Sequence, residues 1–178
     1  MLGLKRGTVR LEMHNPEWDA NAAVTVEMLK EILGTAAVDV QHIGSTAIKW
    51  IHAKPIIDIV VGAVSLENIM KLVPVLEAQG VIFRKQDHPG QLLFVMGDFE
   101  QDYRTHHIHV VEYGAEAWCN YVNFRDYLNA KPEVAAEYDA LKLSLYKEHA
   151  DDRGSYTSGK SQLIDRLLKE AREWAEQQ

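Results

Sequence analysis

The sequence predicts an α+β protein in which a mixed α/β half precedes a helical C-terminal part. In the first half, short apolar β-branched runs alternate with helical patterns, and from residue 115 onward every apolar pattern has helical spacing. The composition is that of a globular protein, since 47% of the 178 residues are hydrophobic and 25% are charged. Because no linker separates the two parts, we expect one domain over residues 1–178, with its helical part at about 115–178.

Charge and composition argue against several classes of protein. The 19 Lys and Arg against 26 Asp and Glu give a formal charge of −7, so we expect no general nucleic-acid binding, although a local basic pocket stays open. No stretch approaches the about 18 apolar residues of a membrane span. The chain starts without an apolar secretory segment and has a single cysteine, Cys119, so we expect a cytoplasmic protein without an internal disulfide.

A short strand and a helix are predicted at the start of the chain. Residues 9–13 have the pattern of a strand. Asn15 followed by Pro16 is typical of a helix start, and Gly34 is typical of a helix end, so we expect a helix between them. Its apolar positions at helical spacing, which predict the buried face, are Val24, Met28, Leu29 and Ile32.

Strands make up most of the remaining first half. Residues 37–43 predict a strand that ends at a Gly-Ser-Thr turn. The β-branched run at 56–61 predicts a strand that is buried on both faces. The other predicted elements are a helix at 66–79, strands at 91–96 and 104–112, and polar loops at 84–90 and 97–102.

The C-terminal part predicts three helices. Positions from Trp118 to Leu128 fit the first helix, and Pro132 is typical of the start of the second. Residues 151–158 are polar and predict a loop in which Thr157 or Ser158 caps the last helix. The predicted inner faces of the last two helices are Val134, Tyr138, Leu141 and Leu145, and Ile164, Leu167, Leu168 and Ala171.

The first candidate functional residue is Asp58, which interrupts the apolar run 56–61. A carboxylate in a buried strand is costly unless it is paired or binds a metal. Lys54 is a possible structural partner, and a metal is the functional alternative; the sequence leaves both open.

His107 and His109 form the second candidate. The period-two alternation of a strand places both imidazoles on one face and Ile108 and Val110 on the other, toward the core. Two imidazoles on one strand face suit a transition metal, or a metal together with a phosphate. The alternative is a pair of surface histidines on a half-exposed sheet.

Two further segments combine hydroxyls with cations. His42 to Thr46 ends a strand in a glycine turn with Ser45 and Thr46, which holds phosphate oxygens in some proteins and is a plain turn in others. Tyr156 to Lys160 places Lys160 in the first turn of the last helix, where it opposes the helix dipole unless an anion binds there. A solvated lysine is the simpler alternative.

Arg125 and Lys142 are charged residues in the helical part. Arg125 lies on the same stripe as the apolar residues of its helix, so it needs a carboxylate or a ligand phosphate. Asp126 and Glu133 are the possible internal partners.

Five blocks in this order resemble the GrpB family, whose members have a nucleotidyltransferase-like fold related to the polymerase-beta superfamily. The blocks are His42-Ile43-Gly44-Ser45-Thr46-Ala47, Lys54-Pro55-Ile56-Ile57-Asp58-Ile59, His107-Ile108-His109-Val110, Phe124-Arg125-Asp126-Tyr127-Leu128 and Tyr156-Thr157-Ser158-Gly159-Lys160. The resemblance runs from about Val9 to Leu168. It implies a mixed β-sheet of the nucleotidyltransferase type flanked by helices, with a helical C-terminal extension.

The resemblance also implies roles and shows departures. It places Gly44 and Ser45 where nucleotidyltransferases hold the triphosphate, and Asp58 where they place a metal-binding carboxylate. Val60 stands where active members usually have a second carboxylate, and the strand of a third acid offers histidines instead. One acid with imidazoles is a poor Mg²⁺ site and favours Mn²⁺ or Zn²⁺. The segment 48–51, Ile-Lys-Trp-Ile, replaces the usual Val-Pro-Gly-Leu.

The leading expectation is a metal-dependent nucleotidyltransferase that binds a nucleotide or a phosphorylated small molecule, with the acceptor open. Asp58 is expected to be catalytic and to hold a divalent ion (Mg, Mn or Zn) with His107 and His109. The residues expected to bind phosphate or nucleotide are Gly44, Ser45, Thr46, Lys54, Arg125 and Lys160, with His42 and Tyr156 as further pocket candidates. The alternatives are a non-catalytic nucleotide or metabolite binder on a degenerate fold, and a phosphoesterase that uses the histidine pair.

Overall fold

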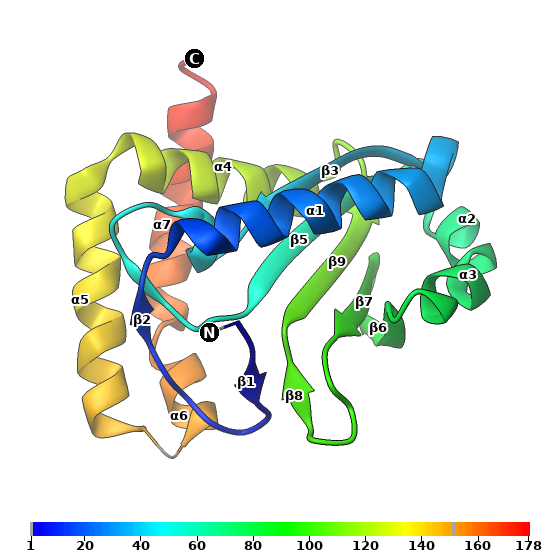
Figure 1. Ribbon diagram of the computed structural model, residues 1–178. Helices are drawn as coiled ribbons and strands as arrows, with labels where there is room; N and C mark the ends of the chain where they lie inside the picture. The colour runs from blue at the N-terminus through cyan, green and yellow to red at the C-terminus, as the bar shows by residue number, and fades with distance from the viewer. Residues whose placement is uncertain (1, 151) are drawn as a thin grey trace.

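A five-stranded mixed sheet forms the centre of the molecule (Figure 1). The computed structural model describes residues 2–150 and 152–178, and the side chains of all of them except 85–88. The strand order is β3-β5-β9-β7-β6, in which β5 and β9 are parallel and the other neighbours are antiparallel. The strands are β3 (Ala37–Ile43), β5 (Ile57–Ala63), β6 (Ile82–His88), β7 (Gln91–Met96) and β9 (His106–Glu112). The predicted fold class, a mixed sheet flanked by helices with a helical C-terminal part, is confirmed.

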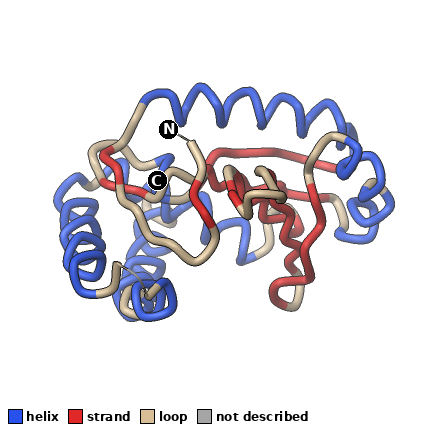
Figure 2. The backbone as a smooth tube through the Cα atoms, turned by 60° about the horizontal axis from the view of Figure 1, so that its bottom comes forward, coloured by secondary structure: helices blue, strands red, loops and turns tan. Residues whose placement is uncertain are grey.

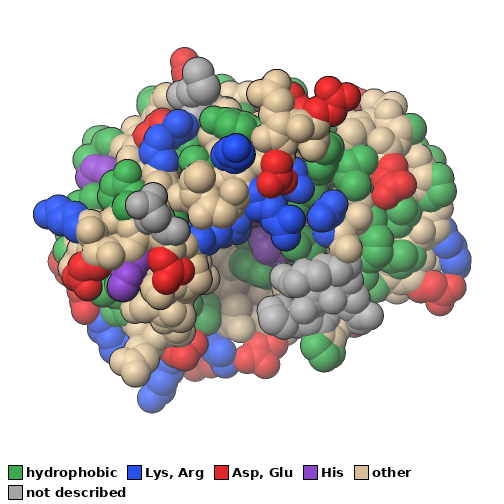
Figure 3. Space-filling view, turned by 90° about the horizontal axis from the view of Figure 1, so that it is seen from below, with side chains coloured by type: hydrophobic (Ala, Val, Ile, Leu, Met, Phe, Trp, Pro, Cys, Tyr) green, Lys and Arg blue, Asp and Glu red, His purple; other side chains and the backbone are tan. Residues whose placement is uncertain are grey.

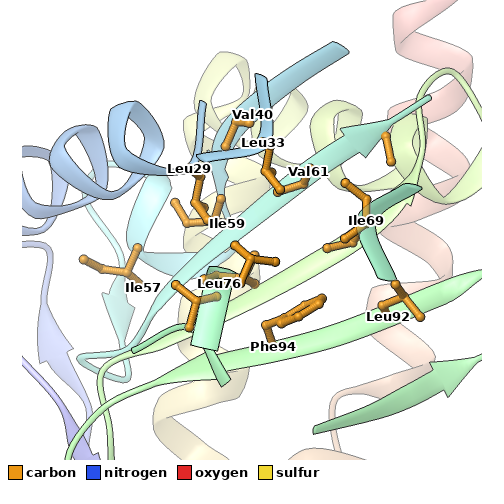
Figure 4. Close-up of a cluster of buried hydrophobic side chains, with 14 of the residues drawn as sticks. Leu29, Leu33, Val40, Ile57, Ile59, Val61, Ile69, Leu76, Leu92 and Phe94 are labelled. Atoms are coloured by element: carbon orange, nitrogen blue, oxygen red, sulfur yellow. The ribbon is translucent and has the colours of Figure 1, made fainter. Parts of the chain in front are cut away.

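Helix α1 (Pro16–Leu33) covers one face of the sheet, with α2 (Leu66–Lys71) and α3 (Val73–Ala78) beyond it (Figures 1 and 2). The main core lies between these helices and the strands, and Figure 4 shows Leu29 and Leu33 of α1 above Ile59 and Val61 of β5. Residues 57, 59 and 61 of β5 all point into this core, as the period of a strand requires.

The C-terminal helices pack against the opposite face and one end of the sheet (Figure 1). They are α4 (Glu116–Ala130), α5 (Pro132–Glu148), α6 (Arg153–Ser158) and α7 (Ser161–Ala175). Trp118 of α4 packs on Val60 and Val111, so β5 is buried on both faces, as predicted from its continuous apolar run. No helix in the described part of the chain is long and apolar enough to cross a membrane.

Two small sheets attach the N-terminal segment to this framework. Strand β1 (Leu4–Lys5) pairs with β8 (Tyr103–Arg104), and β2 (Glu12–Met13) pairs with β4 (His52–Ala53). The predicted strand at 9–13 is therefore limited to two residues. The predicted strand at 104–112 is interrupted at Thr105, where the chain passes from β8 into β9.

The ends of α1 agree with the prediction, and its buried face agrees in part. Asn15 caps the helix by accepting a hydrogen bond from the Glu17 amide at 2.9 Å, and Gly34 stands at the C-cap. Leu29 is buried and Met28 and Ile32 pack partly buried against the core, as predicted, but Val24 is 73% exposed. The other buried positions are Trp18, Ala22, Thr25 and Leu33. The prediction left out Thr25 because it is polar; its hydroxyl is hydrogen-bonded inside the protein to the Asn21 carbonyl and lies 3.1 Å from Nε2 of His106.

Three loop and helix predictions were wrong. The helix predicted at 66–79 is broken at Leu72, because Pro74 lacks the amide that would continue α2 into α3. Residues 82–88, predicted in part as a loop, form the edge strand β6 by backbone pairing with β7. Within the segment predicted as a loop at 151–158, residues 153–158 form α6, because Asp152 caps it by accepting a hydrogen bond from the Ser155 amide; residue 151 lies outside the described residues.

The cap predicted for the last helix was also wrong. Helix α7 begins at Ser161 with Lys160 at its N-cap, and no side chain caps it. Thr157 and Ser158 belong to α6 instead.

Candidate functional site: two pockets that share Asp58

Asp58, His107 and His109 lie together on the sheet face that α4 covers. The parallel register pairs Asp58 with His107 and Val60 with His109. Ile108 and Val110 are buried on the opposite face, so the predicted alternation along β9 is confirmed. Two side chains from β9 and one from β5 therefore meet on this face, near the start of both strands.

The Asp58 carboxylate contacts the two imidazoles, and it forms no ion pair with a lysine among the residues whose side chains are described. Its Oδ1 lies 3.2 Å from Nδ1 of His107 and 3.9 Å from Nε2 of His109, and its side chain is 28% exposed. Burial alone would raise the pKa of Asp58, but the hydrogen bonds and charges of His107 and His109 lower that pKa well below its usual range. Asp58 is therefore an accessible, ionised carboxylate.

These three residues do not by themselves form a closed metal site. Within residues 2–150 and 152–178, no group of three or more His, Cys, Asp or Glu is arranged to hold a metal ion. Nδ1 of His109 lies 3.1 Å from Nε2 of Gln91 and 3.3 Å from the Tyr121 hydroxyl, so this ring is held from the side opposite Asp58. Val60 is fully buried and supplies no second carboxylate. No metal site is thus shown at these three residues, and a divalent ion bound there stays a prediction.

Gly44, in the turn after β3, lies in close contact with the Asp58 side chain. Gly44 has φ 71° and ψ −172°, a conformation essentially reserved for glycine, and a 3₁₀ turn η2 (Ser45–Ala47) follows it. Thr46 is buried and its Oγ1 lies 2.9 Å from Nε2 of His42. Burial lowers the pKa of His42 to about 4 against the opposing charges of Asp19 and Asp58, so this imidazole is neutral near pH 7.

Four cationic side chains line a cavity of about 220 Å³ beside this turn, which we call the cation pocket. The cations are Lys54, Lys142, Arg153 and Lys160. The other lining residues are Ser45, Thr46, Ala53, Ile56, Asp58, His107, Tyr156 and Thr157. The sequence-predicted residues Ser45, Thr46, Lys54, Asp58, His107, Tyr156 and Lys160 are therefore brought together, although they come from distant parts of the chain.

The lysines of the cation pocket are crowded. The ammonium groups of Lys54 and Lys160 each lie 4.5 Å from the centre of the Tyr156 ring. Burial, and then the neighbouring cations Lys160 and Arg153, lower the pKa of Lys54 to about 8. Burial lowers the pKa of Lys160 to about 8 as well, although Asp58 opposes this. The pocket therefore concentrates positive charge without an equal number of carboxylates.

Lys142 is the most buried of the four cations. It is 1% exposed, donates a hydrogen bond to the His52 carbonyl and lies 3.4 Å from Oδ1 of Asp139. Burial lowers its pKa to about 8 in spite of Asp139. Sequence reasoning gave Lys142 no role; its position four residues after Tyr138, on the buried stripe of α5, was the available signal. Arg153 was missed because it lies in the segment predicted as a loop.

Arg125 lies outside the cation pocket. Its Nη1 donates to Oε1 of Gln41 at 2.7 Å and to the His42 carbonyl at 2.9 Å, while Nε donates to Oδ1 of Asp126 at 2.7 Å. Its charge is thus engaged by protein groups, one of which, Asp126, is the internal partner considered from the sequence. Through Gln41 and His42, Arg125 attaches α4 to the end of β3.

A second cavity of about 410 Å³ lies on the other side of Asp58, and we call it the apolar pocket. Its lining residues are Ile43, Gly44, Asp58, Gln91, His109, Ala117, Asn120, Tyr121, Phe124, Tyr138, Ile164 and Leu168. Ile164 and Leu168, predicted as core positions of the last helix, line this cavity. Figure 3 shows a hollow in the surface of the molecule, with Lys and Arg side chains gathered beside it and a His side chain at its edge.

A protein-family model described as GrpB protein matches residues 8–170 of this chain. The chain belongs to the GrpB family. It is 40% identical over 173 residues to the glutamate-rich protein GrpB of Alkalihalophilus pseudofirmus, covering 96% of this chain and 99% of that protein. It is 33% identical to the protein YqkA of Bacillus subtilis and spans 48% of that longer relative. The resemblance seen in the sequence is thereby confirmed.

Solved structures agree with the family and extend the fold comparison. The crystal structure of GrpB from Enterococcus faecalis has a TM-score of 0.85 and 29% identity, over 93% of this chain and 99% of that one. A crystal structure of the Cid1 poly(U) polymerase with Mg 3′-dATP bound has a TM-score of 0.52 and 14% identity, over 84% of this chain and 49% of that one. This GrpB chain therefore has a nucleotidyltransferase-like fold; at that identity the likeness shows the fold alone.

Proposed function

We propose that this GrpB protein binds a nucleotide, or a phosphorylated metabolite of similar build, with the phosphates in the cation pocket. The observation that carries the proposal is the convergence of Lys54, Lys142, Lys160 and Arg153 on one cavity beside Asp58. Ammonium and guanidinium groups hold phosphate oxygens through charge-assisted hydrogen bonds.

The lowered pKa values of the lysines support an anionic ligand. Each ammonium is buried and near other cations, which raises the free energy of its charged form. A bound phosphate supplies negative charge at the centre of the group and favours the charged lysines again. The nucleotide is the ligand class named for the structurally similar Cid1 polymerase, which supports choosing it over a simple anion.

Nucleotidyl transfer is the second candidate function, and the position of Asp58 favours it. Its carboxylate is accessible and lines both pockets, so it faces the place where a phosphate in one pocket would meet a group in the other. In such a transfer an acceptor attacks the α-phosphorus and pyrophosphate leaves. Because the described residues hold no three-ligand metal site, a divalent ion (Mg, Mn or Zn) would enter with the nucleotide as part of the substrate.

A thermal unfolding titration with ATP and UTP, with Mg²⁺ or with EDTA, tests the binding proposal. A ligand at about 100 times its Kd stabilises the fold by roughly 2.7 kcal/mol, a shift of several degrees for a chain of this size. We expect stabilisation of the wild type and a clear loss of affinity in Lys160→Gln. Lys169→Gln, on the helix that Lys160 precedes but 80% exposed in its side chain, is the matched control and should bind like the wild type.

The two candidate functions differ in the metal requirement and in product. Binding that survives EDTA and yields no pyrophosphate with any acceptor supports a non-catalytic binder. Pyrophosphate release that Asp58→Asn abolishes supports transfer. No stabilisation by any nucleotide, or equal affinities in Lys160→Gln and Lys169→Gln, would overturn the proposal as a whole.

A further inference from the structure

The apolar pocket differs in chemistry from the cation pocket, although Asp58 lines both. Its lining residues in the described part of the chain include no Lys or Arg. Three aromatic side chains form much of its wall, namely Tyr121 and Phe124 from α4 and Tyr138 from α5. The cavity is therefore suited to an uncharged, flat group and not to a phosphate.

The sizes of the two cavities favour one ligand that spans both. The cation pocket, at about 220 Å³, is smaller than the range of about 300–1,000 Å³ that is usual for small-molecule sites, whereas the apolar pocket, at about 410 Å³, falls within it. A nucleoside with its phosphates does not fit into the cation pocket alone. Because Asp58 lines both cavities, they lie next to each other, and a ligand with an anionic end and an aromatic body is the kind that would use both.

A buried acceptor in the apolar pocket lacks a donor. Asn120 of α4 lines the cavity, and its Oδ1 is buried without a hydrogen-bond partner among the described residues. Such an acceptor is costly in a folded protein, and a ligand N–H would satisfy it once the Asn120 amide turns toward the cavity. By contrast, the neighbouring polar groups are engaged: the Tyr121 hydroxyl donates to Oε1 of Gln91 at 3.2 Å, and Nε2 of Gln91 lies 3.1 Å from Nδ1 of His109.

The aromatic wall offers surfaces for stacking. Phe124 and Tyr138 meet edge to face with their ring centres 5.7 Å apart, and His109 and Tyr121 lie 5.1 Å apart with an interplanar angle of 32°. These contacts fix the rings in place, so little side-chain freedom is lost when a planar ligand packs against them. Nucleobases combine a flat π-face with ring or exocyclic N–H donors, which matches both features.

We propose that the apolar pocket binds the nucleobase of the same nucleotide whose phosphates occupy the cation pocket, with Asn120 accepting a hydrogen bond from an N–H of the base. This inference rests on the proposed function. It assigns specificity to a surface formed by β7, β9, α4, α5 and α7, whereas the phosphate-binding residues supply affinity that is independent of the base.

The test compares ligands that occupy one pocket or both. Isothermal titration calorimetry with the four ribonucleoside triphosphates and with inorganic tripolyphosphate gives the affinities of wild type, Asn120→Leu and Leu168→Trp. We expect at least one nucleotide to bind more tightly than tripolyphosphate. In both variants its affinity should fall about tenfold or more, as expected for a lost hydrogen bond or a filled pocket, while tripolyphosphate binds as before.

Controls separate this inference from the proposed function. Asn123→Leu, one helical turn after Asn120 and outside both pockets, should keep the wild-type affinities, and thermal unfolding of each variant checks that it folds. If tripolyphosphate binds but no nucleotide binds more tightly, or if the Asn120 and Leu168 variants keep full nucleotide affinity, the inference fails and phosphate binding stands. If adenosine binds without competing with a bound nucleotide, the pocket serves a second ligand and the inference fails. If neither tripolyphosphate nor any nucleotide binds, the proposed function fails with it.

Discussion

The Asp58 side chain packs directly on the backbone of Gly44. A Cβ placed on Gly44 would lie 2.9 Å from Cβ of Asp58 and closer still to its carboxylate. The turn after β3 and the carboxylate of β5 are thus fitted to each other across the Ile43–Asp58 register pair. The absence of a side chain at residue 44 is what lets the carboxylate lie between the two pockets.

Gly44→Ala should therefore disturb both stability and ligand binding. The substitution meets a backbone conformation that favours glycine and a contact with Asp58 that has no free space. We expect a loss of about 2 kcal/mol or more in the free energy of unfolding, together with a loss of nucleotide affinity. Urea unfolding and nucleotide titration measure the two effects.

Gly114→Ala is the matched control for this substitution. Gly114 also has a positive φ, +77°, but a Cβ there would have nothing within 4 Å in the described structure. Gly114→Ala should lower the free energy of unfolding by only about 1 kcal/mol, the cost of a left-handed backbone conformation for a residue with a Cβ, and should leave binding unchanged. Equal losses in the two variants would show that the Gly44–Asp58 contact adds nothing.

Ligand affinity should fall as the pH rises above 8. The pKa values of Lys54, Lys142 and Lys160 are lowered to about 8 from an ordinary 10.5, mainly by burial, so these side chains lose their charge early in the alkaline range. Calorimetric titration of ATP at pH 7, 8, 9 and 10 should show weakening over this interval. A constant affinity up to pH 10 would contradict a role for these lysines in binding phosphate.

The lowered pKa values of these three lysines should make the ligand-free protein more stable as the pH rises, although they weaken ligand binding. Between about pH 8 and pH 10.5 the folded state binds fewer protons at these lysines than the unfolded state does. The contribution of the lysines to the free energy of unfolding therefore rises with pH in that window. Replacing Lys160 by Gln should reduce this rise, because one lysine and its effect on the pKa of Lys54 are removed. Urea unfolding at several pH values measures it.

Arg125→Gln should reduce stability without reducing nucleotide affinity. The guanidinium donates to Gln41, the His42 carbonyl and Asp126 but does not line either pocket. We expect a loss of about 1.5–3 kcal/mol in the free energy of unfolding, since hydrogen bonds of a charged group are lost inside the protein. The Kd for a nucleotide should change less than about twofold.

Arg166→Gln controls for the loss of an arginine charge. Arg166 is an exposed residue paired with Glu137 and Glu170, so its removal should cost less than about 1 kcal/mol. A large fall in nucleotide affinity in Arg125→Gln alone would place Arg125 in the binding site after all.

Local sequence patterns predicted the strands and the side-chain faces of the site. The uninterrupted apolar run around Asp58 and the alternation at His107 and His109 are properties of residues that are neighbours in the chain, and period two fixes their orientation. What local patterns do not contain is the partner across the fold. The contact of Arg125 with Gln41 spans 84 residues, and that of Lys142 with the His52 carbonyl spans 90.

Because local patterns do not contain long-range partners, they could not separate the predicted binding residues that line the cation pocket from Arg125, which does not. Lys54 and Lys160 reach one ring, Tyr156, although more than a hundred residues separate Lys54 from α7. Arg125 has a similar sequence signal, a cation on a buried stripe, but turns to protein acceptors instead. The sequence could predict that these charged side chains are buried. Which group neutralises each charge depends on how the helices pack, and the spacing of residues along the chain does not show that.

Trp50→Gly should stabilise the protein. Trp50 has φ 68°, a left-handed conformation that costs a residue with a Cβ about 1–2 kcal/mol, and the ring is 81% exposed, so little burial is lost with it. In the GrpB family the usual segment at residues 48–51 is Val-Pro-Gly-Leu, which has glycine at position 50. The added freedom of glycine in the unfolded chain offsets part of the gain, which leaves about 0.5–1 kcal/mol.

The control for this substitution keeps the Cβ and removes only the ring. Trp50→Ala retains the left-handed strain, so it should leave the free energy of unfolding close to that of the wild type. Urea unfolding of the three proteins measures the difference. A glycine variant no more stable than the alanine variant would mean that the exposed ring, and not the backbone conformation, decides the stability of this turn. Because Trp50 lies outside both pockets, nucleotide affinity should be equal in all three proteins.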